Sequence, residues 1–176
     1  MAAIKAIETQ YKGYRFRSRL EARWAMFFDF SGIKWYYENE GYELSSGWYL
    51  PDFWLPEYRL HVEVKPDGIC KHAASFRDDE VGAIAVTQGL PDEGVEVYCW
   101  DIGDSSAGSS DRWCQWSDGP RGIKLHCNRA SHRELYFDCP FSGEETSAAD
   151  VYWDSSVTSR LRTAFEFAKS ARFDRK

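Results

Sequence analysis

Between residues 18 and 65, apolar residues recur first at helical spacing and then at every second position, which predicts a helix followed by strands. In residues 18–30 apolar side chains recur at helical spacing, and Ser31-Gly32 follows directly as a helix-ending pair. In residues 59–65 apolar and polar side chains alternate, and Glu63 and Lys65 fall on polar positions. Because successive side chains of a strand point to opposite faces, we expect Glu63 and Lys65 on the same face.

The pattern of the remaining chain predicts an α/β fold. Predicted strands lie at residues 34–38, 48–54, 59–65, 83–87 and 95–100, and predicted helices at 18–30, 69–79 and 157–173. This order favours a mixed central sheet flanked by helices. Short aromatic or β-branched pieces between two polar loops predict a small β-rich insertion or hairpin before the last helix.

Three segments follow from this order: a core (1–102), a loop-rich β insertion or degenerate zinc-ribbon-like subdomain (103–150), and a C-terminal helix packing on the core (151–176). A length of 176 residues with 43% hydrophobic residues suits one globular domain with a small appendage. Residues 1–10 lack the long apolar core of a secretory signal, and no later run is apolar enough to cross a bilayer. We therefore expect a cytoplasmic protein without a membrane partner.

The net charge of −6 is unevenly distributed along the chain. Residues 1–35 carry seven Lys and Arg against three acids, and residues 157–176 carry six against two, so the acidic excess lies between them. Basic ends around an acidic centre suit a protein that grips phosphates near metal-binding carboxylates. A solvated surface without any partner is the simpler interpretation of the same charges.

The five cysteines are odd in number and widely scattered. In a cytoplasmic protein we expect mostly reduced thiols. A zinc knuckle built from Cys114, Cys127, Cys139 and a histidine (His126 or His132) is the alternative, but no C-x-x-C pair is present. Ordinary buried thiols and surface histidines are therefore favoured.

Asp52, Glu63 and Lys65 form the candidate catalytic set. Asp52 and Glu63 lie near the ends of neighbouring predicted strands, so their carboxylates are able to share one hard divalent cation, Mg²⁺ or Mn²⁺. Lys65 directs its ammonium to the same place, where it orients a water molecule or neutralises charge in a transition state. Two carboxylates keep this lysine charged, which makes it an electrostatic aid rather than a free base.

The spacing of these residues resembles a known signature. Pro51-Asp52, ten intervening residues and Glu63-Val64-Lys65 look like the motif of the PD-(D/E)xK phosphodiesterase superfamily, which includes restriction enzymes, resolvases, repair nicking enzymes and transposon-end nucleases. Residues 16–24 (FRSRLEARW) are similar to the first helix of small phage and mobile-element members. The likeness covers roughly residues 12–100.

The resemblance implies a restriction-endonuclease-like core and a metal-dependent deoxyribonuclease, an endonuclease of phage or mobile-element origin. It implies that Asp52, Glu63 and the Val64 carbonyl hold one or two Mg²⁺ or Mn²⁺ ions. It also adds Glu21, because the helix glutamate of the similar members reaches the metal site. The sequence offers a second explanation for Glu21, which forms a capping box with Ser18, although a carboxylate beside the apolar stripe is costly to bury unpartnered.

DNA is the expected partner, and polar and basic residues around the predicted site are its expected contacts. They are Arg15, Arg17, Arg19 and Arg23 near the first helix and Gln88 on the fourth predicted strand, with Arg160, Arg162 and Arg172 of the last helix as further candidates. A solvated surface is the alternative for all of them. Cleavage of both strands would favour a homodimer.

The catalytic candidates also have simpler interpretations. Glu63 and Lys65 suit an exposed pair on an edge strand, and Asp52 suits a turn after Pro51. Two other functions stay open: a catalytically inactive nucleic-acid-binding subunit with a nuclease-like fold, and an interaction protein whose aromatic residues dock a partner. The second requires an exposed patch, whereas a nuclease core buries most of the aromatic residues concerned, which are Trp35, Tyr36, Tyr37, Trp48, Tyr49 and Trp54.

Overall fold

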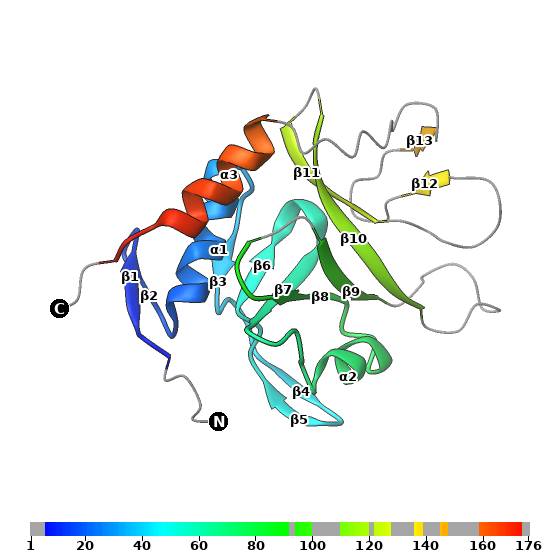
Figure 1. The fold of residues 1–176 in the computed structure, drawn as a ribbon. Helices are drawn as coiled ribbons and strands as arrows, with labels where there is room; N and C mark the ends of the chain where they lie inside the picture. Colours follow the sequence, from blue (N-terminus) through cyan, green and yellow to red (C-terminus); the bar gives the residue numbers. More distant parts are fainter. Residues whose placement is uncertain are drawn as a thin grey trace.

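A mixed sheet of seven strands lies at the centre of the computed structural model, which describes residues 6–91, 94–99, 110–119, 122–127, 136–138, 145–147 and 159–173 (Figure 1). The strand order is β11-β10-β9-β8-β7-β6-β3. Only β7 and β8 run parallel among these described strands, and the other neighbours are antiparallel. The strands are β3 (Tyr36–Tyr37), β6 (Phe53–Leu55), β7 (Leu60–Lys65), β8 (Ala83–Gln88), β9 (Gly94–Cys99), β10 (Ser110–Gly119) and β11 (Gly122–Cys127).

Helices cover both faces of the sheet. Val62 and Val64 of β7 join the core formed with α1 (Arg19–Phe30) and α3 (Ser159–Ser170). Residues on the other face, such as Val86, pack with α2 (Ala73–Asp78) and the β4–β5 hairpin. The prediction of a mixed α/β fold is therefore confirmed. The hairpins pair β1 (Thr9–Tyr11) with β2 (Tyr14–Phe16), β4 (Tyr42–Leu44) with β5 (Gly47–Tyr49), and β12 (Tyr136–Asp138) with β13 (Glu145–Ser147).

Helix α1 forms where its apolar period predicted it. Ser18 is the N-cap, and its hydroxyl accepts a hydrogen bond from the Glu21 amide at 3.2 Å. Trp24, Phe27 and Phe28 are buried in the core. The Ser31 amide donates to Phe27 O at 2.9 Å and closes the last turn. The helix lies against α3, where Phe27 stacks on Phe165 with ring centroids 5.1 Å apart.

The predicted strand at residues 48–54 is wrong as a single element. It divides into β5, which pairs with β4 in a separate hairpin, and β6, which joins the central sheet. Pro51 lies between them, and proline has no backbone N–H to contribute to a ladder. The break leaves Asp52 directly before β6, and η1 (Pro56–Tyr58) then turns the chain into β7.

Other boundaries differ from the prediction for local reasons. The helix predicted at residues 69–79 begins only at Ala73, because Asp67 Oδ1 accepts from the Ile69 amide at 3.2 Å and Gly68 has φ 72°. The strand predicted at 34–38 contains only β3, and Glu38 with φ 46° ends it. The β1–β2 hairpin was not predicted.

The segment after residue 102 adds strands to the central sheet. Strand β10 pairs with β9, and β11 pairs with β10, both antiparallel. The predicted boundary between residues 102 and 103 lies outside the described residues. None of the helices in the described ranges is long and apolar enough to cross a membrane.

Candidate active site

The register of β6 and β7 brings the two predicted metal-binding acids together. Phe53 lies opposite Val62, so Asp52, one residue before β6, lies beside Glu63. The Asp52 amide donates to Glu63 Oε2 at 3.3 Å. Both side chains are almost fully buried, with 2% of Asp52 and 3% of Glu63 exposed. Residues 11 apart in sequence thus share one face of the sheet.

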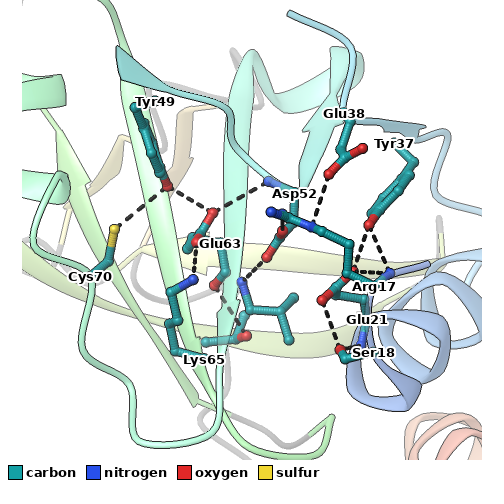
Figure 2. A network of polar contacts seen from close by, with 12 residues as sticks. Arg17, Ser18, Glu21, Tyr37, Glu38, Tyr49, Asp52, Glu63, Lys65 and Cys70 are labelled. Atoms are coloured by element: carbon teal, nitrogen blue, oxygen red, sulfur yellow. Dashed lines mark hydrogen bonds and ion pairs between the residues drawn. The ribbon is translucent and has the colours of Figure 1, made fainter. Parts of the chain in front are cut away.

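One oxygen of each acid is held by donors from inside the protein. Asp52 Oδ2 accepts a hydrogen bond from the Val64 amide at 2.8 Å. Glu63 Oε2 accepts from the Tyr49 hydroxyl at 2.7 Å, as well as from the Asp52 amide (Figure 2). These bonds fix the orientation of both carboxylates, because buried polar groups are costly to leave unbonded.

The other oxygen of each acid contacts a cationic side chain that reaches solvent. Asp52 Oδ1 pairs with Arg17 Nη2, and Glu63 Oε1 pairs with Lys65 Nζ. The exposed fractions are 56% for the Arg17 side chain and 36% for the Lys65 side chain. Figure 2 shows Arg17 and Lys65 approaching the acids from different sides. The buried acids therefore keep two oxygens that do not depend on interior donors.

Burial is the main influence on the pKa of Asp52. Burial, followed by the charges of Glu63 and Glu21, raises this pKa to about 7, although the Val64 amide and Arg17 oppose the shift. Burial lowers the pKa of Lys65, but the hydrogen bond and charge of Glu63 outweigh it, so the pKa of Lys65 is raised. Lys65 thus remains charged, while the raised pKa of Asp52 brings its protonation close to neutral pH.

Glu21 lies beside the two acids but serves the start of α1. Its Oε1 accepts from the Ser18 hydroxyl at 2.7 Å. Its Oε2 accepts from the Arg17 amide at 3.1 Å and from the Tyr37 hydroxyl at 2.6 Å. The capping interpretation accounts for the contacts with Ser18, whereas the bonds from the Arg17 amide and the Tyr37 hydroxyl lie outside a capping box, and the charge of Glu21 acts on Asp52.

Several residues around the acids were not found from the sequence. Tyr49 supports Glu63 and lies 3.5 Å from Cys70 Sγ through its hydroxyl oxygen. Burial, followed by the charge of Glu63, raises the pKa of Tyr49, so the phenol remains a donor. Thr87 donates to the Glu63 carbonyl at 3.3 Å. The position of Thr87 near the end of a predicted strand could have indicated its role. Tyr49 could not be found in this way, because the sequence predicted one strand where the structure has β5 and β6.

Of the four arginines near α1 that were predicted to contact DNA, one lies at the buried acids and the others lie elsewhere. Arg17 enters the site, whereas Arg15 is exposed and pairs with Glu8. Arg19 Nε is buried without a hydrogen-bond partner among the described residues. Arg23 donates to the Ala171 carbonyl at 3.3 Å and so links α1 to the chain after α3.

Gln88 is an exposed neighbour of the site. It ends β8 directly opposite Lys65 in the parallel pair, so both side chains lie on the same face. Its aliphatic carbons lie under Gly68, where an added Cβ would come within 3.2 Å of Gln88 Cβ. Gly68 therefore lets the loop after β7 lie close to this residue.

The two buried acids fit a hard divalent cation. Across the described ranges, no three His, Cys, Asp or Glu side chains form a group that could hold a metal ion. Magnesium is commonly held by one or two carboxylates and water, so Asp52 and Glu63 suffice as side-chain ligands. The oxygens that suit such a cation are Asp52 Oδ1 and Glu63 Oε1, which point toward the solvent-reaching side chains of Arg17 and Lys65 rather than toward the interior donors.

The residues considered for a zinc knuckle are only partly described. Cys114 of β10 lies opposite Cys127 of β11 in the strand register, and His126 lies opposite Gln115. His132 and Cys139 lie outside the described residues. The zinc alternative stays a prediction.

Comparisons with protein-family models, curated proteins and solved structures found no match to this chain. Function is therefore inferred from the residues and their geometry.

Proposed function

We propose that this chain is a metal-dependent deoxyribonuclease with a restriction-endonuclease-like core. The observation that carries the proposal is the pairing of Asp52 with Glu63 across β6 and β7, with Lys65 on the same strand and face as Glu63. The resemblance of the 51–65 segment to the PD-(D/E)xK superfamily supports it, as does the helix that precedes the two strands and carries Glu21.

Asp52 Oδ1 and Glu63 Oε1 are the side-chain oxygens that would hold Mg²⁺ or Mn²⁺, and the resemblance adds the Val64 carbonyl and Glu21. When bound, the cation polarises the phosphoryl oxygen and makes a water ligand more acidic. The Val64 amide and Tyr49 hold the two carboxylates in place. Lys65, kept charged by Glu63, donates to the attacking water or to the phosphate and stabilises charge in the transition state.

DNA would approach from the solvent side of Arg17, Lys65 and Gln88. Arg17 and Lys65 are the cations nearest the acids among the described ion pairs, and Gln88 lies next to Lys65. Arginine binds phosphate oxygens with two parallel hydrogen bonds. A phage or mobile-element origin and a homodimer for two-strand cleavage are part of the same proposal.

A catalytically inactive DNA-binding subunit is the second candidate. The observation that favours it is that Arg17 and Lys65 already neutralise the outward oxygens of both acids. Docking through exposed aromatic residues has less support. Tyr49 is buried, Trp35, Tyr37 and Trp54 are half-buried, and of the six aromatic residues only Trp48 and Tyr36 are exposed.

Cleavage of duplex, single-stranded and junction DNA with Mg²⁺ or Mn²⁺ tests the proposal. We expect products from at least one substrate and none with EDTA. Asp52→Ala and Lys65→Ala are expected to abolish cleavage while circular dichroism shows an intact fold. Asp78→Ala, at an exposed end of α2, is the matched control and should retain cleavage. Full activity of either site variant, or no cleavage by the wild type, would contradict the proposal.

A further inference from the structure

Arg17 pairs with two carboxylates, the buried Asp52 and the more exposed Glu38, whose side chain is 29% exposed. Its Nη2 lies 2.5 Å from Asp52 Oδ1, and its Nε lies 2.9 Å from Glu38 Oε1 (Figure 2). The Arg17 side chain is 56% exposed, whereas that of Asp52 is 2% exposed. The guanidinium is therefore able to move into water, while the carboxylate that it neutralises remains inside the protein.

The backbone around Arg17 is held in place. The Arg17 amide donates to Glu21 Oε2 at 3.1 Å and to the Tyr37 hydroxyl at 3.2 Å. Glu38 is also fixed, because its amide donates to the Asp52 carbonyl at 2.9 Å. Any movement of Arg17 is thus a swing of its side chain from a fixed Cα, with Glu38 as a partner outside the acid pair.

Arg17 occupies the oxygen that a metal ion would need. Asp52 Oδ2 is bound by the Val64 amide, which leaves Oδ1 for an external cation. A guanidinium and a divalent cation at one oxygen repel each other and therefore compete. A DNA phosphate competes for the guanidinium instead, because arginine matches phosphate in charge and bidentate geometry.

We propose that Arg17 couples the binding of metal to the binding of DNA. Without DNA, Arg17 neutralises Asp52 and weakens metal binding; with DNA, it transfers to a backbone phosphate and releases Asp52 Oδ1 to the cation. Each ligand then strengthens the other by the same factor, since such coupling is reciprocal. Arg17 is a positioning residue that acts through Asp52, and this inference rests on the proposed metal-dependent nuclease.

Titration with Mn²⁺, followed by the electron paramagnetic resonance of free Mn²⁺, tests the coupling at pH 8.5. The variants are Arg17→Gln, Arg17→Lys and the control Lys12→Gln, each measured alone and with a phosphorothioate oligonucleotide containing duplex and single-stranded parts. Lys12 matches Arg17 in exposure, at 58%, and also pairs with an aspartate, Asp29, at 3.0 Å. Arg17→Lys retains a charge but has no fork to bridge Asp52 and Glu38.

In the wild type and in Lys12→Gln, we expect the oligonucleotide to raise Mn²⁺ affinity at least fivefold. In Arg17→Gln, Mn²⁺ should bind at least fivefold more tightly without DNA, and the gain from DNA should fall below twofold. Arg17→Lys should lie between them and provides the comparison if Arg17→Gln does not fold. Equal Mn²⁺ affinities without DNA, or an equal gain from DNA in all variants, would overturn the inference while leaving the nuclease proposal standing. Absence of Mn²⁺ binding in every protein would overturn both.

Discussion

Replacement of Asp52 by asparagine is expected to stabilise the metal-free protein at pH 8. Burial, followed by the charges of Glu63 and Glu21, raises the pKa of Asp52 from 3.8 to about 7. At pH 8 the folded protein must hold this carboxylate in its charged form. The difference between the two pKa values corresponds to a cost of about 4 kcal/mol, because one pKa unit is worth about 1.4 kcal/mol.

Asparagine removes that cost but loses part of the bonding. Its amide oxygen still accepts from the Val64 amide, but its amino group faces the Arg17 guanidinium and cannot accept the hydrogen bond that Oδ1 accepts, whereas the charge attraction to Arg17 is already included in the pKa of about 7. The lost interaction costs about 1–2 kcal/mol. The free energy of unfolding should therefore rise by about 2–3 kcal/mol at pH 8, the balance of these two effects.

The advantage of Asp52→Asn should disappear as the pH falls. The pKa of Asp52 is raised in the folded state, so the wild type takes up a proton on folding between about pH 7 and pH 4 and gains stability there. Asparagine does not titrate. The difference in unfolding free energy between the variant and the wild type should shrink by about 2–3 kcal/mol between pH 8 and pH 5.

Urea unfolding followed by tryptophan fluorescence at pH 8 and pH 5 measures both effects. Asp78→Asn is the control with the opposite sign, because the hydrogen bond from Arg77 lowers the pKa of the exposed Asp78. Replacing the Asp78 carboxylate should slightly reduce the free energy of unfolding at pH 8. The electrostatic reasoning would be refuted if Asp52→Asn were less stable than the wild type at pH 8. It would also be refuted if the difference in unfolding free energy between the two proteins were the same at pH 8 and pH 5.

Three further predictions concern the residues around the acids. Lys65→Met should reduce cleavage at least about 100-fold with an unchanged circular dichroism spectrum, because an electrostatic donor to the transition state is lost; a smaller effect would argue against its role. Tyr49→Phe should lower the unfolding free energy by about 2 kcal/mol, because buried Glu63 loses a charged hydrogen bond, and an unchanged urea midpoint would contradict this. Burial lowers the pKa of His61 from 6.5 to about 4, so the unfolded chain binds a proton that the fold excludes, and stability is lost as the pH falls through 6.5. Relative to the wild type, His61→Phe should therefore gain about 2 kcal/mol between pH 7 and pH 5, and a difference independent of pH would show that His61 does not titrate in this way.

Local patterns were sufficient for α1 and β7, which carry Glu21 and Glu63. Helix α1 has its own cap at Ser18 and its own apolar stripe, so its bounds follow from neighbouring residues. The alternation in β7 placed Glu63 and Lys65 on one face, and η1 returned the chain beside β6. Gly13 could also have indicated the hairpin of β1 and β2 in the sequence, because glycine favours the positive φ of a tight turn. In the structure Lys12 and Gly13 have φ of 47° and 83°.

Contacts between distant segments were not accessible from the sequence. Arg17 was predicted as a phosphate contact, but nothing in its neighbourhood indicated Asp52, which lies 35 residues away. Tyr49 reaches Glu63 only because β5 leaves the path of β6 at Pro51 and forms its own hairpin. The direction of that departure depends on packing over Phe76 and Ile84, which is a property of the folded core.

The bonds between the two acids and the opposite backbone constrain how this chain is able to diverge. Glu63 receives the Asp52 amide, and Asp52 receives the Val64 amide, so the carboxylates also fasten one strand to the next. A descendant of the proposed nuclease that lost cleavage would still be selected to retain a side-chain oxygen at both positions, as asparagine or glutamine would supply, because a side chain without one would leave a backbone amide unsatisfied in the sheet. The Lys65 side chain does not fasten one strand to another in this way. Its ion pair among the described contacts is with Glu63, on the same strand. Under the proposed function, substitutions that abolish cleavage should therefore appear first at Lys65, and variation at this position would be the earliest sign of relatives that bind DNA without cutting it.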